Sequence, residues 1–273
     1  MQAIRSPQIL MLSGIGPAEE LAKFDIPVLL DQPGVGRNLS DHGILYHTWK
    51  VKDLSAGWTL GSSNPLFNEP QYSYGTPGDF IVSTDVPKNG LIAAIAEDEG
   101  ATPDSATHPL LANKRTFTEH VPIYAAAPDG SLVTSVLTTM LPTSRGSVKL
   151  SSADTRDPPL IDPNYLGSAV DRYMAREGLK LQAGAPGFDE VLSENSTNKY
   201  IGARLRAAMR SGYHPMGTLV MGAVVDTDLK VKGVEGLRAV DTSVFPVPTT
   251  GHLQVAAVAV AEQAARIIYA SRA

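Results

Sequence analysis

Two histidines lie in short motifs rich in glycine, proline and threonine, and both could move a proton near neutral pH. His214 lies in G-Y-H-P-M-G-T at residues 212–218, and His252 lies in P-T-T-G-H-L-Q at residues 248–254. Imidazole titrates at roughly pH 6.5, which suits it to general acid–base chemistry. Pro215 disfavours a helical conformation at His214, so we expect this imidazole to project from a loop or a strand end. A single histidine is more often a packed or surface residue than a catalytic one. Whether these two histidines are catalytic must therefore be judged from the residues around them.

The segment around both histidines resembles the C-terminal signature of the glucose–methanol–choline (GMC) flavin oxidoreductases. Residue types, order and spacing agree from H-P-M-G-T at residues 214–218, through D-T-S-V-F-P at residues 241–246, to His252. The resemblance is strongest to the branch of fungal aryl-alcohol oxidases and choline-dehydrogenase-like proteins. In that family the first histidine and a later His or Asn face the flavin. The resemblance therefore implies that His214 and His252 are the catalytic residues.

Other segments resemble the same family. S-P at residues 6–7 with S-G-I-G at residues 13–16 matches the second GMC signature, although Gln2 stands where the family has glycine. V-G-R-N-L-S-D-H at residues 35–42 is similar to the family motif V-G-x-N-L-x-D-H, which includes His42 without giving it a role. Residues 53–130 match weakly and would correspond to the variable wall of the substrate site.

The resemblance implies FAD as the cofactor and four more residues at its site. Asp241 ends a short strand expected at residues 236–241, and Thr242 follows it. The family's equivalent backbone lies near the ribityl–pyrophosphate part of FAD. Leu253 and Gln254 begin the last expected helix, where backbone N–H groups can approach the pyrimidine edge of the flavin. Taken alone, Asp241 would be an ordinary turn residue. No metal site is expected.

Alcohol oxidation by a flavin requires a base for the hydroxyl proton, a second polar group at the same oxygen, and hydride transfer to flavin N5. The resemblance implies that His214 is the base and that His252 positions the oxygen or shares the proton. The implied substrate is a primary alcohol, aromatic in the nearest branch. Two alternatives stay open: a non-catalytic remnant of a GMC protein, and a family member that performs cyclisation or elimination without redox chemistry.

The chain contains no complete G-x-G-x-x-G loop, the motif that holds the ADP half of FAD. The two G-x-G sequences, at residues 14–16 and 34–36, have Glu19 and Leu39 at the third glycine position. The comparison with the family therefore predicts a truncated product that lacks roughly the N-terminal half of such an enzyme. Such a product could come from a split or mis-started gene, be a fragment, or be one half of a two-chain enzyme. In the last case the missing N-terminal half is an expected partner besides FAD and the alcohol.

The composition excludes several other classes of function. A net charge of −5 without a Lys/Arg run argues against a nucleic-acid surface. No eighteen consecutive residues are all apolar, so no membrane span is expected. The chain has no cysteine, which excludes disulfides and cysteine-ligated metals. The first residues do not form a signal peptide, although the family is often secreted, and the compartment is left open.

The expected fold class is α+β, with an antiparallel substrate-domain sheet covered by helices on one face and an incomplete portion of an FAD-binding α/β domain. Alternating residues predict strands at 44–51, 131–141 and 146–152, the last two joined by a turn. Helices are expected from Pro7, near 168–182, near 196–210 and at 254–270, the last apolar enough to pack inside a domain. Residues 53–115 are expected to be mostly irregular.

Three segments define the expected domains. Residues 1–42 form part of the FAD-binding domain, residues 43–210 form the substrate-binding domain, and residues 211–273 form the C-terminal segment of the FAD-binding domain with both catalytic histidines.

Overall fold

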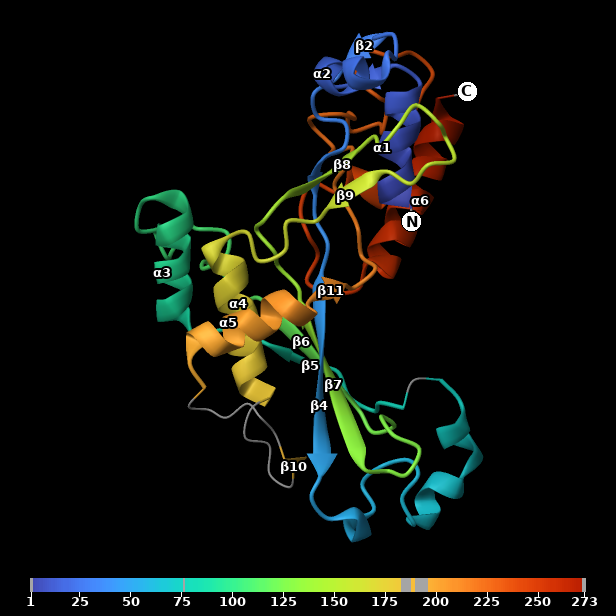
Figure 1. Cartoon of the computed structure of the whole chain (residues 1–273). Coiled ribbons are helices and arrows are strands. Elements are labelled where there is room, and N and C mark those ends of the chain that lie inside the picture. Colours follow the sequence, from blue (N-terminus) through green and yellow to red (C-terminus); the bar gives the residue numbers. More distant parts are fainter. Residues whose placement is uncertain (1, 76, 183–187, 190–195, 272–273) are drawn as a thin grey trace. The chain divides into compact units, whose positions relative to one another are not determined.

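The computed structural model describes residues 2–75, 77–182, 188–189 and 196–271, and the chain divides into two compact units (Figure 1). Unit 1 consists of Met1–His42, Pro142–Gly167 and Ser211–Ala273, and unit 2 consists of Gly43–Leu141 and Ser168–Arg210. Helices are combined with mainly antiparallel sheets, so the expected α+β class is confirmed.

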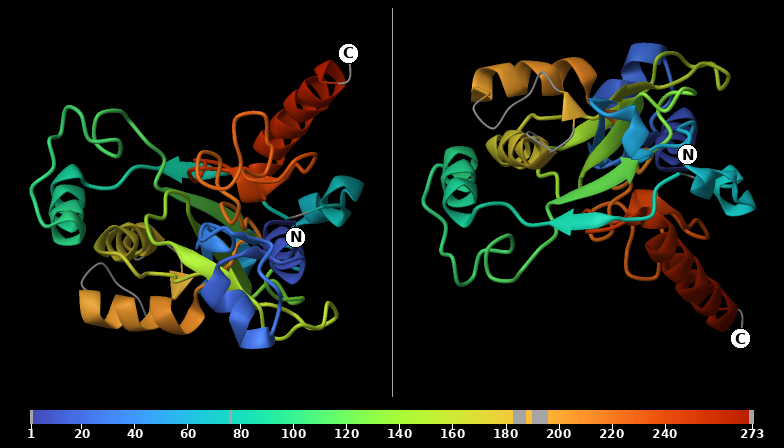
Figure 2. Two further views of the ribbon diagram at one scale, coloured as in Figure 1. Left: turned by 90° about the horizontal axis from the view of Figure 1, so that it is seen from above. Right: turned by 90° about the horizontal axis from the view of Figure 1, so that it is seen from below.

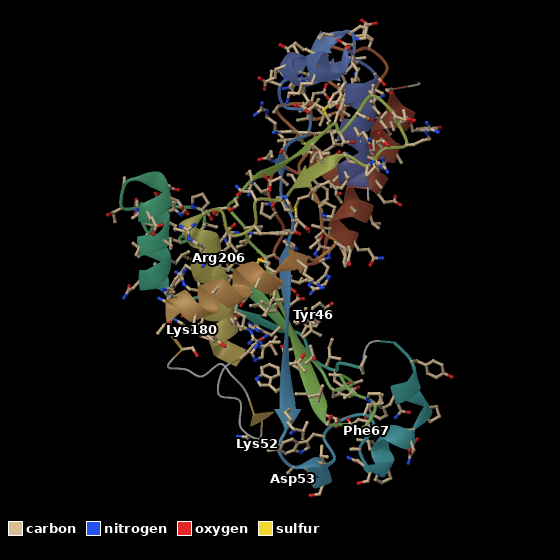
Figure 3. The ribbon with its side chains drawn as sticks, viewed as in Figure 1. Tyr46, Lys52, Asp53, Phe67, Lys180 and Arg206 are labelled. Atoms are coloured by element: carbon tan, nitrogen blue, oxygen red, sulfur yellow. The ribbon has the colours of Figure 1, made fainter. Side chains whose placement is uncertain are left out.

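Unit 2 is built on an antiparallel sheet with the strand order β10–β4–β7–β6–β5. Its strands are β4 (Gly43–Val51), β5 (Val82–Thr84), β6 (Thr118–Ile123), β7 (Leu132–Thr139) and β10 (Phe188–Asp189). Burial alternates along β4, so that His47 and Trp49 are buried on one face, whereas Tyr46 is exposed on the other (Figure 3). The strands predicted at 44–51 and 131–141 are confirmed.

The helices α3 (Lys88–Glu99), α4 (Ala169–Gln182) and α5 (Asn198–Ala208) lie on one side of this sheet (Figures 1 and 2). Helix α4 packs against β6 and β7, and α3 packs against α4. The hydroxyl of Ser168 accepts a hydrogen bond from the Asp171 N–H and begins α4. The helices predicted near 168–182 and 196–210 are therefore confirmed.

Residues 53–115 are more regular than expected. They contain α3 and the 3₁₀ helices η2 (Leu54–Ala56), η3 (Pro65–Asn68, with Phe67 in Figure 3) and η4 (Pro70–Ser73). Pro87 precedes α3, and Gly100 ends it in the left-handed conformation with φ 73°. These boundary residues mark the helix, whereas its short apolar run does not distinguish a helix from a strand.

Unit 1 combines a three-stranded sheet with helices from both ends of the chain. The sheet consists of β3 (Arg37–Leu39), β8 (Gly146–Lys149) and β9 (Leu160–Asp162). The other elements are α1 (Gln2–Leu12), β1 (Ile15–Gly16), α2 (Ala18–Leu21), η1 (Ala22–Phe24), β2 (Leu30–Asp31), η5 (Thr242–Val244) and α6 (Leu253–Ala270). The short strand β11 (Arg210–Ser211) pairs with β4 as the sixth strand of the larger sheet. Met11 of α1, Val244 of η5 and Leu253 of α6 belong to one buried core. The ends of the chain are thus packed together, as the sequence predicts.

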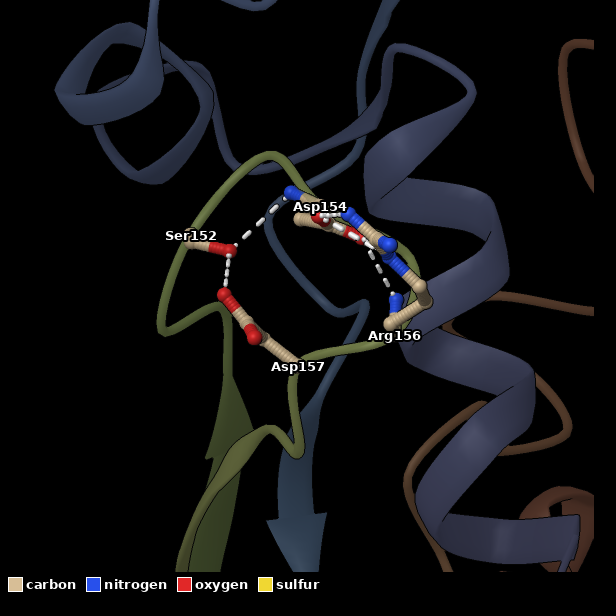
Figure 4. Close-up of polar contacts among 4 residues, drawn as sticks. All are labelled: Ser152, Asp154, Arg156 and Asp157. Carbon is tan, nitrogen blue, oxygen red and sulfur yellow. Dashed lines mark hydrogen bonds and ion pairs between the residues drawn. The ribbon is translucent and has the colours of Figure 1, made fainter.

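The segment 142–167 differs from the prediction, which places it within the 43–210 domain and makes 146–152 the hairpin partner of 131–141. Strand β8 instead pairs with β3 and β9, so the segment belongs to unit 1. The turn after β8 is fixed by Ser152, Asp154, Arg156 and Asp157, and Asp154 holds both the backbone and the guanidinium of Arg156 (Figure 4). The carbonyl of Asp157 accepts a hydrogen bond of 2.9 Å from Gln8 of α1.

Helix α1 begins at Gln2, earlier than the predicted start at Pro7. A proline inside a helix has no N–H to donate to the carbonyl four residues before it, which here is that of Ala3. The buried hydroxyl of Thr218 donates to the Ala3 carbonyl instead, at 2.5 Å. The last residue of the H-P-M-G-T motif therefore completes the hydrogen bonding of α1.

Helix α6 is mostly exposed, contrary to the prediction that it packs inside a domain. Leu253 and Ala264 are buried, whereas Val255 and Tyr269 are each 80% exposed. By length and composition alone, α6 could cross a membrane, although Glu262 and Arg266 interrupt its apolar residues. The core helix of a globular protein can have the same length and composition. Its apolar composition predicts burial but does not specify a partner.

We expect Thr218→Val to lower the free energy of unfolding by about 1–3 kcal/mol, because it leaves the buried Ala3 carbonyl without a donor. In a Pro7→Ala background the new N–H of residue 7 can bond to that carbonyl, so the same substitution should cost less. Urea unfolding of the four proteins of this double-mutant cycle measures the difference. Equal costs in both backgrounds would contradict the proposed exchange of donors.

Candidate active site

The buried carboxylate of Asp41 joins three segments of unit 1. Its Oδ1 accepts a hydrogen bond from the His214 N–H at 2.9 Å. Its Oδ2 accepts from the hydroxyls of Tyr165 at 2.5 Å and Ser211 at 2.6 Å. Burial raises the pKa of Asp41, and these hydrogen bonds oppose the rise. The backbone that carries His214 is therefore fixed directly to the end of the V-G-R-N-L-S-D-H motif.

The H-P-M-G-T turn is held close to the same motif by backbone contacts. Ser40 and Met216 exchange backbone hydrogen bonds of 3.0 and 2.9 Å. Gly217 has φ 84°, and a Cβ at this position would lie 2.7 Å from the Asn38 carbonyl oxygen. Only glycine combines this conformation with such a close approach. The turn that follows His214 therefore requires the glycine of the motif.

Three imidazoles lie in contact in unit 1. The Nδ1 atoms of His42 and His214 are 3.0 Å apart, which is a hydrogen-bond distance. The ring centroids of His214 and His252 are 4.6 Å apart, with an interplanar angle of 82°. His42 is fully buried, whereas His214 and His252 line a cavity of about 360 Å³. The structure thus brings together the two histidines that the sequence singles out and adds a third behind them.

The cavity contains most of the residues predicted for the site. Its lining includes His214, His252, Thr242, Leu253 and Gln254. The hydroxyl of Thr242 donates to the Pro215 carbonyl at 2.8 Å, which ties η5 to the histidine motif. His252 precedes α6 and makes no side-chain cap hydrogen bond, so the first N–H groups of the helix are uncapped beside the cavity.

Asp241 is placed differently from the other predicted residues. Its carboxylate accepts hydrogen bonds of 2.7 Å from the Ser6 hydroxyl and 2.7 Å from the Ser243 N–H, and it does not line the cavity. The side chain therefore links η5 to α1. Contact between the backbone of this segment and FAD stays a prediction.

Sequence reasoning missed the roles of Asp41, His42 and Tyr165. The similarity of residues 35–42 to a family motif was the available signal, but nothing in the sequence places that motif beside His214. Among the described residues, no group of three His, Cys, Asp or Glu side chains is arranged to hold a metal ion.

Two family models, both described as GMC oxidoreductase, match residues 1–44 and residues 142–261. Mitochondrial choline dehydrogenase from Mus musculus is 37% identical over 294 residues, which cover 97% of this chain and 46% of that protein. Versicolorin B synthase stcN from Emericella nidulans is 36% identical over 300 residues, which cover 98% of this chain and 45% of that protein.

A solved fungal aryl-alcohol oxidase is similar in structure, with a TM-score of 0.75 and 27% sequence identity. The match covers 97% of this chain and 53% of that one. The chain thus spans about half the length of the proteins to which it is similar.

We expect Asp41→Ala to destabilise the chain by about 3 kcal/mol or more, because it leaves the His214 N–H and two hydroxyls without their acceptor. Asp41→Asn should cost less, since its carbonyl still accepts from the His214 N–H and its amide can donate to the hydroxyls. Urea unfolding measures both values. If Asp41→Ala lowers the free energy of unfolding no more than Asp41→Asn does, the hydrogen bonds accepted by Asp41 do not hold this region together.

Proposed function

The chain belongs to the GMC oxidoreductase family, and from this membership we propose that it takes part in the FAD-dependent oxidation of a small-molecule alcohol. FAD is the cofactor of the family, whose oxidoreductases act on CH–OH groups. The observation that carries the proposal is the contact of His214 and His252 at one cavity, with ring centroids 4.6 Å apart.

The donors around this cavity fit a flavin ring. The uncapped N–H groups at the start of α6, at Leu253 and Gln254, would bind the carbonyl oxygens of the pyrimidine edge. Thr242 and Pro215 line the same cavity and would contact the ring system. When bound, FAD accepts the hydride from the alcohol carbon at flavin N5.

His214 is the proposed base for the alcohol hydroxyl. If His214 donates its Nδ1 proton to Nδ1 of His42, its Nε2 atom keeps a lone pair that can accept the hydroxyl proton. The buried position of His42 then favours one tautomer and one orientation of His214. His42 is thus a positioning residue for the His214 ring, and Asp41 fixes the backbone of His214 by accepting its N–H.

His252 is the proposed partner of His214 at the substrate oxygen. A ring N–H of His252 would donate to the same alcohol oxygen, which holds the oxygen and stabilises negative charge as the proton leaves. The two rings are nearly perpendicular, so their edges can converge on one point. We propose a primary alcohol as the substrate. Aromatic alcohols are the first class to test, because an aryl-alcohol oxidase is among the similar structures.

A second candidate is a cyclisation or elimination without net redox change, and it stays open because one similar protein, versicolorin B synthase, is named as a synthase and not as an oxidase or dehydrogenase. Two imidazoles at one oxygen could serve such a proton transfer equally well. A non-catalytic remnant is the third possibility. Bleaching of the flavin absorbance by an alcohol distinguishes redox chemistry from both of these, and isomerisation of a substrate without bleaching identifies the second.

The 273 residues alone should bind FAD weakly, with a dissociation constant on the order of 10 μM or higher, and show little alcohol oxidation. They contribute the groups around the flavin ring but contain no G-x-G-x-x-G loop, whose helix N-terminus binds the pyrophosphate. Titration by flavin fluorescence, with and without a polypeptide that carries this loop, measures the affinity. Submicromolar binding with turnover by the 273 residues alone would contradict the expectation.

In the enzyme assembled with FAD, His214→Gln should lower kcat by about 10²–10⁴, because a positioned base contributes on this order. His252→Asn should lower kcat less, since the amide can still donate to the alcohol oxygen. His108→Gln is the matched control, because His108 pairs with Glu99 in unit 2 and lies outside the site. Loss of flavin binding in the His214 variant would instead indicate a structural role, and an unchanged kcat would exclude it as the base.

A further inference from the structure

The outward side of helix α6 follows the residue spacing of a helix–helix contact. Leu253, Val260 and Ala264 of this helix pack toward the core of unit 1. On the opposite side, exposed residues recur at alternating intervals of three and four, which is the seven-residue repeat of packed helices. These residues, which we call the α6 stripe, are Val255, Val258, Glu262, Ala265 and Tyr269. The spacing therefore marks one continuous surface along the helix.

The large apolar side chains of the α6 stripe are strongly exposed. Val255 and Tyr269 are each 80% exposed, and Val258 is 57% exposed. Apolar residues scattered singly over a surface are ordinary, whereas a row of them along one helix is typical of an interaction site. The apolar composition of α6 does not specify the partner, but the charged residues on this side of the helix narrow the choice.

Glu262 and Arg266 lie near the middle of the same side of α6. Each is two residues from the buried Ala264, and two residues turn a helix by about 200°, so both side chains point away from the core. Side chains four residues apart can form an ion pair within one helix. Among the residues that the structure describes, however, neither Glu262 nor Arg266 belongs to an ion pair. A helix that offers the same two charges in the opposite direction would pair both of them.

We propose that α6 packs antiparallel against α6 of a second copy of this chain, about a two-fold axis midway between Glu262 and Arg266. This axis places Glu262 of each copy beside Arg266 of the other, so two ion pairs form at the centre. It also places Tyr269 of each copy against Val258 and Ala259 of the other, which covers apolar surface at both ends of the contact. A parallel pair would set Glu262 against Glu262 and Arg266 against Arg266. The proposal does not depend on the alcohol oxidation proposed above.

Analytical ultracentrifugation of the full chain over a range of concentrations tests this contact. For one pair of helices we expect a dimer with a dissociation constant on the order of 10–100 μM. Glu262→Arg and Arg266→Glu should each weaken the dimer about tenfold or more, because each sets two pairs of like charges against each other. The double variant restores opposite charges and should dimerise within about threefold of the original chain.

Glu69→Arg is the matched control, because it changes the net charge equally at an exposed position of unit 2, outside α6. Circular dichroism checks that every variant is folded. A chain that stays monomeric well above the expected dissociation constant would overturn the proposal, even if a polypeptide with the G-x-G-x-x-G loop binds the α6 stripe. A double variant that dimerises no better than the single variants would overturn it as well.

The direction of the helices can be tested by cross-linking, because the chain has no cysteine of its own. Ala259→Cys and Tyr269→Cys are prepared as separate proteins. In the antiparallel pair these two positions face each other, whereas two copies of residue 259 are about 15 Å apart along the axis, beyond the reach of a disulfide. Oxidation with diamide should therefore cross-link a mixture of the two proteins but neither protein alone. Cross-linking of Ala259→Cys with itself, or no cross-link in the mixture, would contradict the proposed arrangement.

Discussion

The hydrogen bonds of the Asp41 carboxylate are the constraint on which the candidate active site depends. One buried side chain accepts from the backbone of His214 and from the hydroxyls of Ser211 and Tyr165, which come from distant parts of the sequence. A buried carboxylate is unfavourable unless such donors surround it. If one of these segments moved, a buried polar group would lose its hydrogen-bond partner. The hydrogen bond from Thr218 to the Ala3 carbonyl acts in the same direction, since it joins the other end of the histidine motif to α1.

This framework explains how two loop histidines can be arranged precisely enough for proton transfer. His214 is held through its backbone by Asp41 and through its ring by His42, which is fully buried. His252 is held by its position at the start of α6, where Leu253 is anchored in the core of unit 1. The scaffold thus presents two imidazole edges and a set of helix N–H groups to one cavity, and the proposed oxidation of an alcohol rests on this arrangement.

The sequence predicts the elements with strong periodicity and the histidine pair, but not the partners of several segments. Alternation reveals β4 and β7, and the amphipathic pattern reveals α4 and α5, because these signals are local. The pairing of β8 with β3 depends on residues far apart in sequence, and a hairpin with β7 fits the local pattern equally well. The early start of α1 is compatible with Pro7 only because Thr218 replaces the missing donor. His42 could be recognised as a motif residue, but its contact with His214 is visible only in three dimensions.

The most direct test of this account is a crystal structure of the enzyme assembled with FAD and an alcohol substrate analogue. The account predicts that the flavin ring occupies the cavity at the start of α6. It also predicts that the analogue's oxygen lies within about 2.6–3.2 Å of a ring nitrogen of both His214 and His252, the range in which proton transfer is possible. A flavin ring bound away from this cavity, or a substrate oxygen out of reach of both imidazoles, would contradict it.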